Sequence, residues 1–506
     1  MSRTLSATLL AVAVAVLTGC AQPAPNDPST LSIGVVDDPP GLDPAEHADP
    51  SALGIAGDVF ETLVRLRPGT FDVVPGLAQS WSVSSDAATW TFVLRPGAKF
   101  SDGTNVDAAA VKANFDRWRL SSDPNRQGLD FPVYPQYFGG VDAQSVIDDV
   151  HVDGPSSIVV HTRAPFAPLL RTLTLPSFGI GSPTAFGNDY KLYDELPVAS
   201  GPYRVAEFQG GDHVTLTPNP EWHGHGPRLP AIVIRTIPDP PTGVLLLEKD
   251  DVDALADPPP EVASDIATRS DMRILRWPRD ALCYLIFDFD RPPFDEAKAR
   301  QGVAAAIDRG AIASRFGDPR VRPARGFFLP TMLGDDPAIV PVTHDLRAAR
   351  ALLASAAATP ITLYYPATAT ALLPDPDGIA HEIQNDLSAA GLSVTLSATD
   401  TVAIPANLAG GALALGVVEA PSGDPDELLA PLAATWHDPD FSAGVARGRA
   451  TIDEAARGTV YRQLDALITA RSAAVPLAYP ARVSAASARA TVRLDSALLP
   501  PLLGNE

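Results

Sequence analysis

Apolar runs of strand length alternate along this chain with segments of helical apolar spacing, and this alternation limits the possible fold more than any other feature. Leu31–Val36 and Trp90–Leu94 have the length and residue types of strands. Val111, Phe115 and Trp118 recur at the spacing of one helix face. Sequences with this mixture form α/β domains, in which helices cover sheets. A chain of 506 residues is longer than one core requires, so we predict two or three lobes.

The same patterns predict further elements. We expect one helix to begin at Ala108 with Asp107 as its cap, and another to end before Gly391, which suits a C-terminal cap. The other expected helices and strands are helices over 51–66, 297–312 and 379–390, and strands over 158–160, 232–234, 361–365 and 392–396.

The first twenty residues predict export from the cytoplasm. Arg3 precedes the apolar run Leu9–Leu17, which is too short to span a membrane and reads as a signal peptide over 1–19. Leu17-Thr18-Gly19-Cys20 resembles the lipobox of bacterial lipoproteins, which implies a lipid on Cys20. The alternative is an ordinary signal peptide followed by a chance cysteine. Residues 20–30 are polar and rich in proline, as expected of a tether that holds the protein at the outer face of the cell membrane, on the periplasmic or cell-wall side.

Charge and cysteine content exclude several classes of protein. The formal net charge of −22 repels the phosphates of nucleic acids, so we expect no nucleic-acid partner. With only two cysteines, the chain has no disulfide framework. Cys283 lies within the apolar run Ala281–Phe287, which predicts an inert thiol in a buried strand.

Several stretches, in one consistent order, resemble motifs of the bacterial extracellular solute-binding protein family 5, which includes peptide- and nickel-complex-binding receptors. They are Gly41–Pro44, Phe60–Val64, Val74–Trp81, Trp90–Gly97 with Phe100–Gly103, Ser200–Tyr203, Asn219–Gly224, Pro292–Asp295 and Ala306–Arg309. Glycine and proline fix turns in these motifs and their aromatic residues fill cores, so we interpret the motifs as marks of the fold.

The resemblance implies an α/β, periplasmic-binding-protein-like fold of the type II, large peptide-binding class, with two lobes and a central ligand cleft. Lobe I would comprise 31–66, 200–268 and 476–506, with an inserted subdomain over 67–199, and lobe II would span 269–475. It also implies the substrate-binding lipoprotein of an ABC importer, which closes over a peptide or peptide-like solute and delivers it to a membrane permease. Separate permease and ATPase subunits would be its partners, and the protein itself would be a monomer.

Two departures from the family affect the expected pocket. Peptide-binding relatives carry an acidic residue in lobe II that pairs with the ligand's amino group. When Gly423–Asp426 is aligned with the Gly-Asp-Pro-Asp motif of the family, Pro421 falls at that position. Glu419 is then either a substitute for the missing acid or a solvated loop residue. In the cleft loop, Pro39 and Pro40 lack the N–H groups that would pair with an extended peptide, although Asp38 stands where relatives carry an acid.

The predicted ligand-binding residues are therefore Asp38, Pro39, Glu419, Ser422 and Asp424. Asp424, Asp426 and Glu427 also suit the N-terminal cap of a helix that begins near Leu428. An arginine fork is the natural partner of a ligand carboxylate, but the sequence does not single out Arg322, Arg325 or any other.

No pattern predicts an enzyme, a cofactor or a metal site. There is no Gly-x-Ser-x-Gly and no phosphate-binding glycine loop, and the histidines are scattered. His223 and His225 have chelate spacing, but a glycine-rich surface loop explains them as well. Two alternatives stay open: a regulatory or interaction lipoprotein of the cell envelope that reuses the fold, and a receptor for a non-peptide solute such as a metal chelate or haem.

Overall fold

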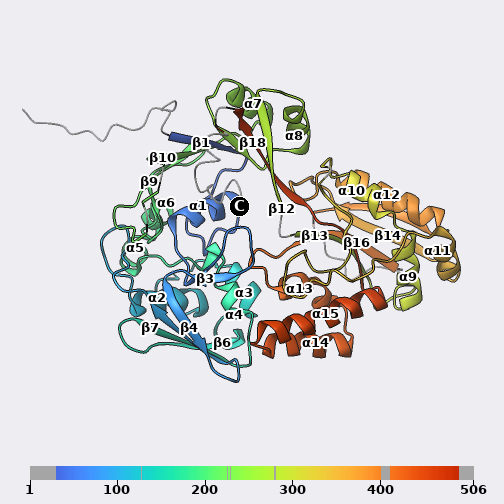
Figure 1. Ribbon diagram of the computed structural model, residues 1–506, viewed down its shortest axis with the longest axis horizontal. Helices are drawn as coiled ribbons and strands as arrows, with labels where there is room; N and C mark the ends of the chain where they lie inside the picture. Colours follow the sequence, from blue (N-terminus) through green and yellow to red (C-terminus); the bar gives the residue numbers. More distant parts are fainter. Residues whose placement is uncertain are drawn as a thin grey trace, which may run out of the picture.

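The chain folds around three main β-sheets, which Figure 1 shows in a computed structural model. The structure describes residues 30–490 except 127, 225, 228, 279–280, 319, 401–410 and 489. Within these residues the sheets have seven, five and four strands, and a two-stranded ribbon accompanies them. Helices and strands are interspersed along the chain, which confirms the predicted α/β class.

The seven-stranded sheet defines lobe I. Its central strand β1 pairs in parallel with β10 and β11, with Ile33 opposite Ile234 and Ala254. All of β1 is buried, because one face joins the lobe I core and Gly34 on the other face packs against Ile237. The strands in sheet order are β12 (Met272–Pro278), β18 (Ala481–Ser487), β11 (Ala254–Ala256), β1 (Thr30–Val35), β10 (Ala231–Thr236), β9 (His213–Pro218) and β8 (Tyr203–Gln209). The helices are α1 (Pro50–Val59), α7 (Pro240–Glu248) and α8 (Pro260–Ala267).

The four-stranded sheet forms the inserted subdomain. Its strands run antiparallel in the order β4 (Ala78–Val83), β5 (Thr89–Leu94), β7 (Ser157–Thr162) and β6 (Ile147–Val152). The ribbon of β2 (Val64–Leu66) and β3 (Val73–Pro75) leads into it. Its helices are α2 (Ala108–Arg119), α3 (Val133–Phe138), α4 (Leu169–Thr172), α5 (Pro183–Asn188) and α6 (Tyr190–Glu195).

The five-stranded sheet is the centre of lobe II. The strands in sheet order are β15 (Ser393–Thr399), β14 (Pro360–Pro366), β16 (Gly411–Glu419), β13 (Ala281–Phe287) and β17 (Ala474–Ala478). The helices are α9 (Ala297–Ala306), α10 (Arg309–Ser314), α11 (Leu346–Leu353), α12 (Pro376–Ala389), α13 (Pro425–Thr435), α14 (Pro439–Ala450) and α15 (Glu454–Arg471).

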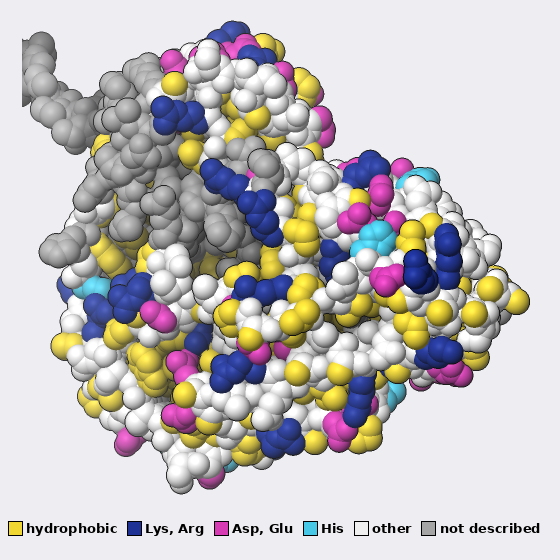
Figure 2. All heavy atoms as spheres, turned by 45° about the vertical axis from the view of Figure 1, so that its right-hand side comes forward, with side chains coloured by type: hydrophobic (Ala, Val, Ile, Leu, Met, Phe, Trp, Pro, Cys, Tyr) yellow, Lys and Arg dark blue, Asp and Glu magenta, His cyan; other side chains and the backbone are white. Residues whose placement is uncertain are grey.

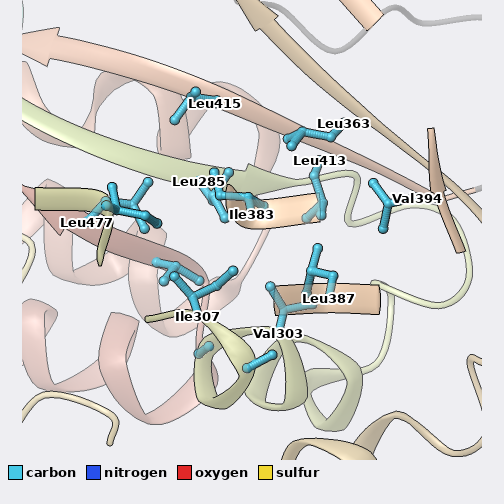
Figure 3. Close-up of a cluster of buried hydrophobic side chains, with 14 of the residues drawn as sticks. Leu285, Val303, Ile307, Leu363, Ile383, Leu387, Val394, Leu413, Leu415 and Leu477 are labelled. Carbon is cyan, nitrogen blue, oxygen red and sulfur yellow. The ribbon is translucent and has the colours of Figure 1, made fainter. Parts of the chain in front are cut away.

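Strand β13 lies between two cores, which explains why all of its residues are buried. Side chains on a strand point alternately to opposite faces. Cys283 and Leu285 therefore join one core, whereas Leu282 and Tyr284 join the other. Figure 3 shows the first core, where apolar side chains of the sheet meet those of α9 and α12. Each such leucine or valine stabilises the fold by about 1.5–3 kcal/mol relative to an exposed side chain.

The two large sheets are joined by two neighbouring strand crossings. Strand β12 of lobe I continues into β13 of lobe II, and β17 of lobe II continues into β18 of lobe I. Pro278 pairs with Ala481 on one side of the crossing, and Cys283 pairs with Ala478 on the other. The change of sheet thus falls between 278 and 281 and between 478 and 481, whereas the sequence placed the boundaries at 268/269 and 475/476.

Two predicted helices are wrong in extent. The helix expected over 51–66 ends at Val59, because the Gly201 N–H binds the Val59 carbonyl and residues 62–63 pair instead with 77–78. The helix expected over 297–312 is split into α9 and α10, because Asp308 accepts hydrogen bonds from Gly310 N and Ala311 N and so begins a new helix.

Some of the residues on which the predicted membrane attachment depends are not described by the structure. Cys20 and the predicted signal peptide lie outside the described residues. No helix in the described part of the chain combines the length and apolarity needed to cross a bilayer.

Candidate ligand-binding site

The lobe I side of the site is the edge where β1, β10 and β11 end. In open α/β sheets, ligands bind outside the carboxyl ends of parallel strands. Asp38 lies in the loop that follows β1, and its two carboxylate oxygens accept hydrogen bonds from Gly211 N at 2.8 Å and Thr236 Oγ1 at 2.7 Å. Asp38 is exposed, whereas Pro39 is buried. The loop is therefore fixed to its own lobe with an acidic side chain on its surface.

A buried ion pair holds the next part of this loop against the subdomain. Asp43 accepts a hydrogen bond from Arg117 Nη2 at 2.9 Å, and their side chains are 0% and 1% exposed. The Arg117 guanidinium also lies 4.4 Å from the centre of the Phe186 ring. The Leu-Asp-Pro motif thus anchors the loop, in agreement with its interpretation as a mark of the fold.

Glu46, His47 and Asp194 bring donor atoms within 4.8 Å of one another beside the same loop, which is the donor chemistry of a metal site. Asp194, however, already accepts hydrogen bonds from Asp43 N at 3.0 Å and His47 Nε2 at 3.0 Å. Burial lowers the pKa of His47, but the hydrogen bond and charge of Asp194 outweigh it and raise that pKa above its ordinary value. These hydrogen bonds engage His47 and Asp194 in a link between the loop that follows β1 and α6.

On the lobe II side, β16 carries Glu419 to the point where the chain crosses between lobes. Glu419 pairs with Ala281, the first residue of β13 after the crossing, and it is exposed. Pro421 is exposed beside it, whereas Ser422 is fully buried and its Oγ accepts a hydrogen bond from Asp424 N at 3.3 Å.

Asp424 faces inward and has a partner within lobe II. Arg457 donates two hydrogen bonds to its carboxylate, from Nη1 at 2.7 Å and from Nη2 at 2.9 Å, and both side chains are nearly inaccessible to solvent. Asp424 also accepts a hydrogen bond from Asp426 N and caps α13, as the helix-cap interpretation of this segment predicted. Burial lowers the pKa of Arg457, but the charge of Asp424 outweighs it and raises that pKa.

Lobe II and the subdomain also meet away from the strand crossings, and we call this the second interlobe contact. It joins Phe71, Tyr137, Ala167 and Arg171 to Gly423, Glu427, Arg449 and Glu454. Tyr137 Oη donates to Glu427 Oε1 at 2.6 Å, Arg171 pairs with Glu454 at 2.7 Å, and Ala167 N donates to the Arg449 carbonyl at 2.7 Å. Figure 1 shows α13, α14 and α15 on the side of lobe II that faces α3 and α4.

Sequence reasoning missed the subdomain half of this contact. Tyr137 lies in an aromatic segment that packs on Phe178 and carries no functional signal. Glu427 was visible only as a helix-cap candidate. Burial raises the pKa of Tyr137, and the charges of Glu427 and Glu419 raise it further. Glu419 therefore acts electrostatically on a residue of this contact.

The structure divides the predicted residues between the lobes. Asp38 and Pro39 lie on lobe I, whereas Glu419, Ser422 and Asp424 lie on one segment of lobe II. Only Asp38 and Glu419 are exposed.

Further polar residues that the sequence brought forward are also engaged in contacts. His223 is held by Glu61 at 3.0 Å and by Arg95 at 3.1 Å, and His225 lies outside the described residues. Arg325 pairs with Asp335 at 2.6 Å. Basic and acidic side chains are interspersed over the face in Figure 2, where the described residues form no continuous basic patch.

Two large sheets linked by paired strand crossings are the architecture of a two-lobed solute-binding protein. The family model for bacterial extracellular solute-binding proteins, family 5 (Middle), matches residues 72–442. The chain therefore belongs to this family, which confirms both the resemblance found in the sequence and the two-lobed fold.

Known relatives agree with this assignment. Di/tripeptide-binding protein 2 of Pseudomonas aeruginosa (strain UCBPP-PA14) is 25% identical over 485 residues, covering 90% of each chain. The periplasmic binding protein DppA of Helicobacter pylori, solved with the peptide STSA, has a TM-score of 0.71 at 21% identity and covers 90% of this chain and 94% of its own. NikA of Brucella suis, solved with Fe(III)-EDTA, has a TM-score of 0.74 at 22% identity, with 91% and 95% covered. The first two of these proteins are binding proteins by name.

Proposed function

We propose that this protein is the substrate-binding lipoprotein of an ABC importer and captures a peptide or peptide-like solute between its lobes. The exposed carboxylate of Glu419, at the point where the chain crosses between lobes, carries the proposal. A di/tripeptide-binding relative that spans 90% of the chain supports the ligand class. Permease and ATPase subunits would receive the solute, and a lipid on Cys20 would hold the monomeric receptor at the membrane.

Glu419 would take the part of the acid that Pro421 replaces. A ligand ammonium that leaves water needs a counter-charge, because an unpaired buried charge is costly. Asp424 is less suited to this part, because its side chain is buried inside lobe II, where it pairs with Arg457. Asp38 offers a second carboxylate from lobe I, and Pro39 shapes the loop without donating a backbone hydrogen bond.

Capture would follow from a shift between open and closed forms. The two strand crossings are short, so the lobes can rotate about them while each core stays intact. A solute that contacts both lobes only when they are closed stabilises the closed form. Binding and release need no bond to be made or broken, so no enzyme activity is proposed.

Calorimetric titration against a library of dipeptides to pentapeptides tests the proposal. Glu419→Gln should weaken binding by about 10- to 150-fold, the loss of one charge-assisted hydrogen bond of roughly 1.5–3 kcal/mol. Glu296→Gln is the matched control, because Glu296 is an exposed acid of lobe II that caps no helix with its side chain. If no peptide in the library gives a binding signal, that result would count against a peptide ligand.

A receptor for a non-peptide solute is the second candidate. The prolines at 39, 40 and 421 remove features of peptide recognition, and a neighbour of the same fold is solved with an iron chelate. Native mass spectrometry of the purified protein distinguishes the two by the mass of any captured solute. A protein that never carries or binds a solute, but binds another envelope protein, would favour the regulatory alternative.

A further inference from the structure

The second interlobe contact encloses a carboxyl group that has no cationic partner among the described residues. Glu427 Oε1 accepts from the Tyr137 hydroxyl at 2.6 Å and from Ser422 N at 3.4 Å. Glu427 Oε2 is buried without any hydrogen-bond partner. A carboxylate in this position would be poorly stabilised, because an unsatisfied buried charge is costly.

The nearby arginines already bind other carboxylates. Arg457 of α15 pairs with Asp424, and Arg449 of α14 pairs with Asp426 at 2.5 Å. Tyr461 of α15 also donates to Asp426 at 2.6 Å. Glu427 is therefore left with neutral donors.

The other charged groups near Glu427 are acids. Asp424 lies three residues before Glu427 on the same segment, and its charge adds to burial in raising the pKa of Glu427. Glu419, at the end of β16, adds to burial in raising the pKa of Tyr137, the α3 residue that donates to Glu427. Burial and the charge of Asp424 also raise the pKa of Asp426, but its partners Arg449 and Tyr461 lie within lobe II and stay with it when the lobes part. Glu427 differs because its hydroxyl partner belongs to the subdomain.

We propose that closing the lobes is linked to uptake of one proton by Glu427, so that the second interlobe contact favours the closed form in mildly acidic medium. The proton comes from solvent while the lobes are apart and forms the O–H of a neutral carboxyl group. The effect on ligand affinity rests on the proposed function, whereas the effect on closure does not. Glu427 would thus set the affinity without contacting the ligand.

The direction of the pH dependence follows from the pKa in the two forms. We call the arrangement in which the second interlobe contact is made the closed form. Burial raises the pKa of Glu427 to about 8 in this arrangement. When the lobes part, the side chain meets water and its pKa returns toward about 4.3. The added stability of the closed form is complete below the open-form pKa and is lost as the pH rises through about 8. Between pH 6 and pH 8 the ratio of closed to open protein should fall by roughly 10- to 50-fold.

Small-angle X-ray scattering of the full chain without added solute tests closure directly. The radius of gyration of the wild type should increase from pH 6 to pH 8. Glu427→Gln, which resembles the protonated acid, should stay compact at both values, and the control Glu296→Gln should follow the wild type. A wild type that does not change, or a Glu427→Gln variant with the same pH response, would overturn the proposal.

Amide hydrogen exchange at Ala167 gives a local readout of the same contact, because its N–H donates to the Arg449 carbonyl across it. At pH 8 this amide should be better protected in Glu427→Gln than in the wild type, and at pH 6 the two should agree. Equal protection at both pH values would contradict the proposal. Neither measurement depends on a peptide ligand, so a silent peptide library would leave this test intact.

Discussion

Gly423→Ala should hold the lobes apart, because Gly423 sits directly against a ring of the subdomain. A Cβ added at Gly423 would lie 2.1 Å from Phe71 Cδ1 and 2.7 Å from Cγ. Carbon atoms pack at about 3.5–4.0 Å, so the ring or the loop must retreat by more than an ångström. The Phe71 carbonyl accepts a hydrogen bond from Arg171, which limits how far the backbone that carries the ring can move.

The magnitude follows from the bonds of the second interlobe contact. The contacts described above include three polar ones that cross it, those of Tyr137, Arg171 and Ala167. At a net value of about 1 kcal/mol each, losing one of them shifts the closed-to-open ratio about fivefold, and losing all three shifts it about 150-fold. A ligand that binds only the closed form would lose affinity by up to the same factor, which is reached where the open form predominates.

The variant also strains its own backbone, since Gly423 has φ +67°. Alanine in this region costs about 1–2 kcal/mol, but this cost is paid in both forms and does not change their ratio. Gly317→Ala is the matched control: Gly317 has φ +66°, also lies in lobe II, and has open space where its Cβ would be. It should lower the melting temperature without changing closure.

Scattering without solute and calorimetry with a bound peptide measure the two effects. The double variant Gly423→Ala, Phe71→Ala should recover much of the closure, because it removes the ring that the new methyl group meets. If Gly423→Ala closes as readily as Gly317→Ala, the contact with Phe71 has no part in closure and the reasoning is refuted.

Two further predictions concern stability and reactivity. Arg117→Met should lower the free energy of unfolding by about 3–5 kcal/mol, because it leaves Asp43 buried and unpaired. Urea unfolding followed by tryptophan fluorescence measures this, and a loss below about 1 kcal/mol would show that the pair contributes little. Burial raises the pKa of the Cys283 thiol, so in a Cys20→Ser protein it should not react with a thiol reagent until urea unfolds the chain. Rapid reaction of the folded protein would contradict the buried position of β13.

Much of the fold could be predicted because its signals are local. Strand β1, helix α2 with its Asp107 cap and the turn at Gly391 each follow from residues within a few positions of one another. The split between α9 and α10 also had a local signal, since Asp308 followed by Arg309 and Gly310 is a helix cap. It was overlooked because the apolar periodicity continues across it.

The candidate site was predictable only in part. The segment that carries Glu419 could be located from its neighbours in the chain, but the direction of each side chain could not. Ser422 and Asp424 were predicted beside Glu419, yet they point into lobe II, because Arg457, distant in sequence, neutralises Asp424. The order of residues does not state which distant charges will meet.

By itself, the sequence determined the family, the α/β class and the motif that anchors the loop after β1, because periodicity, turn residues and caps act over short distances along the chain. Tertiary structure alone decided which carboxylates are neutralised and which are not. Tyr137 and Glu427 are 290 residues apart, and only the packing of the subdomain against lobe II brings them within a hydrogen bond. The cost of burying a charge depends on such contacts, so the behaviour of Glu427 follows from the folded molecule.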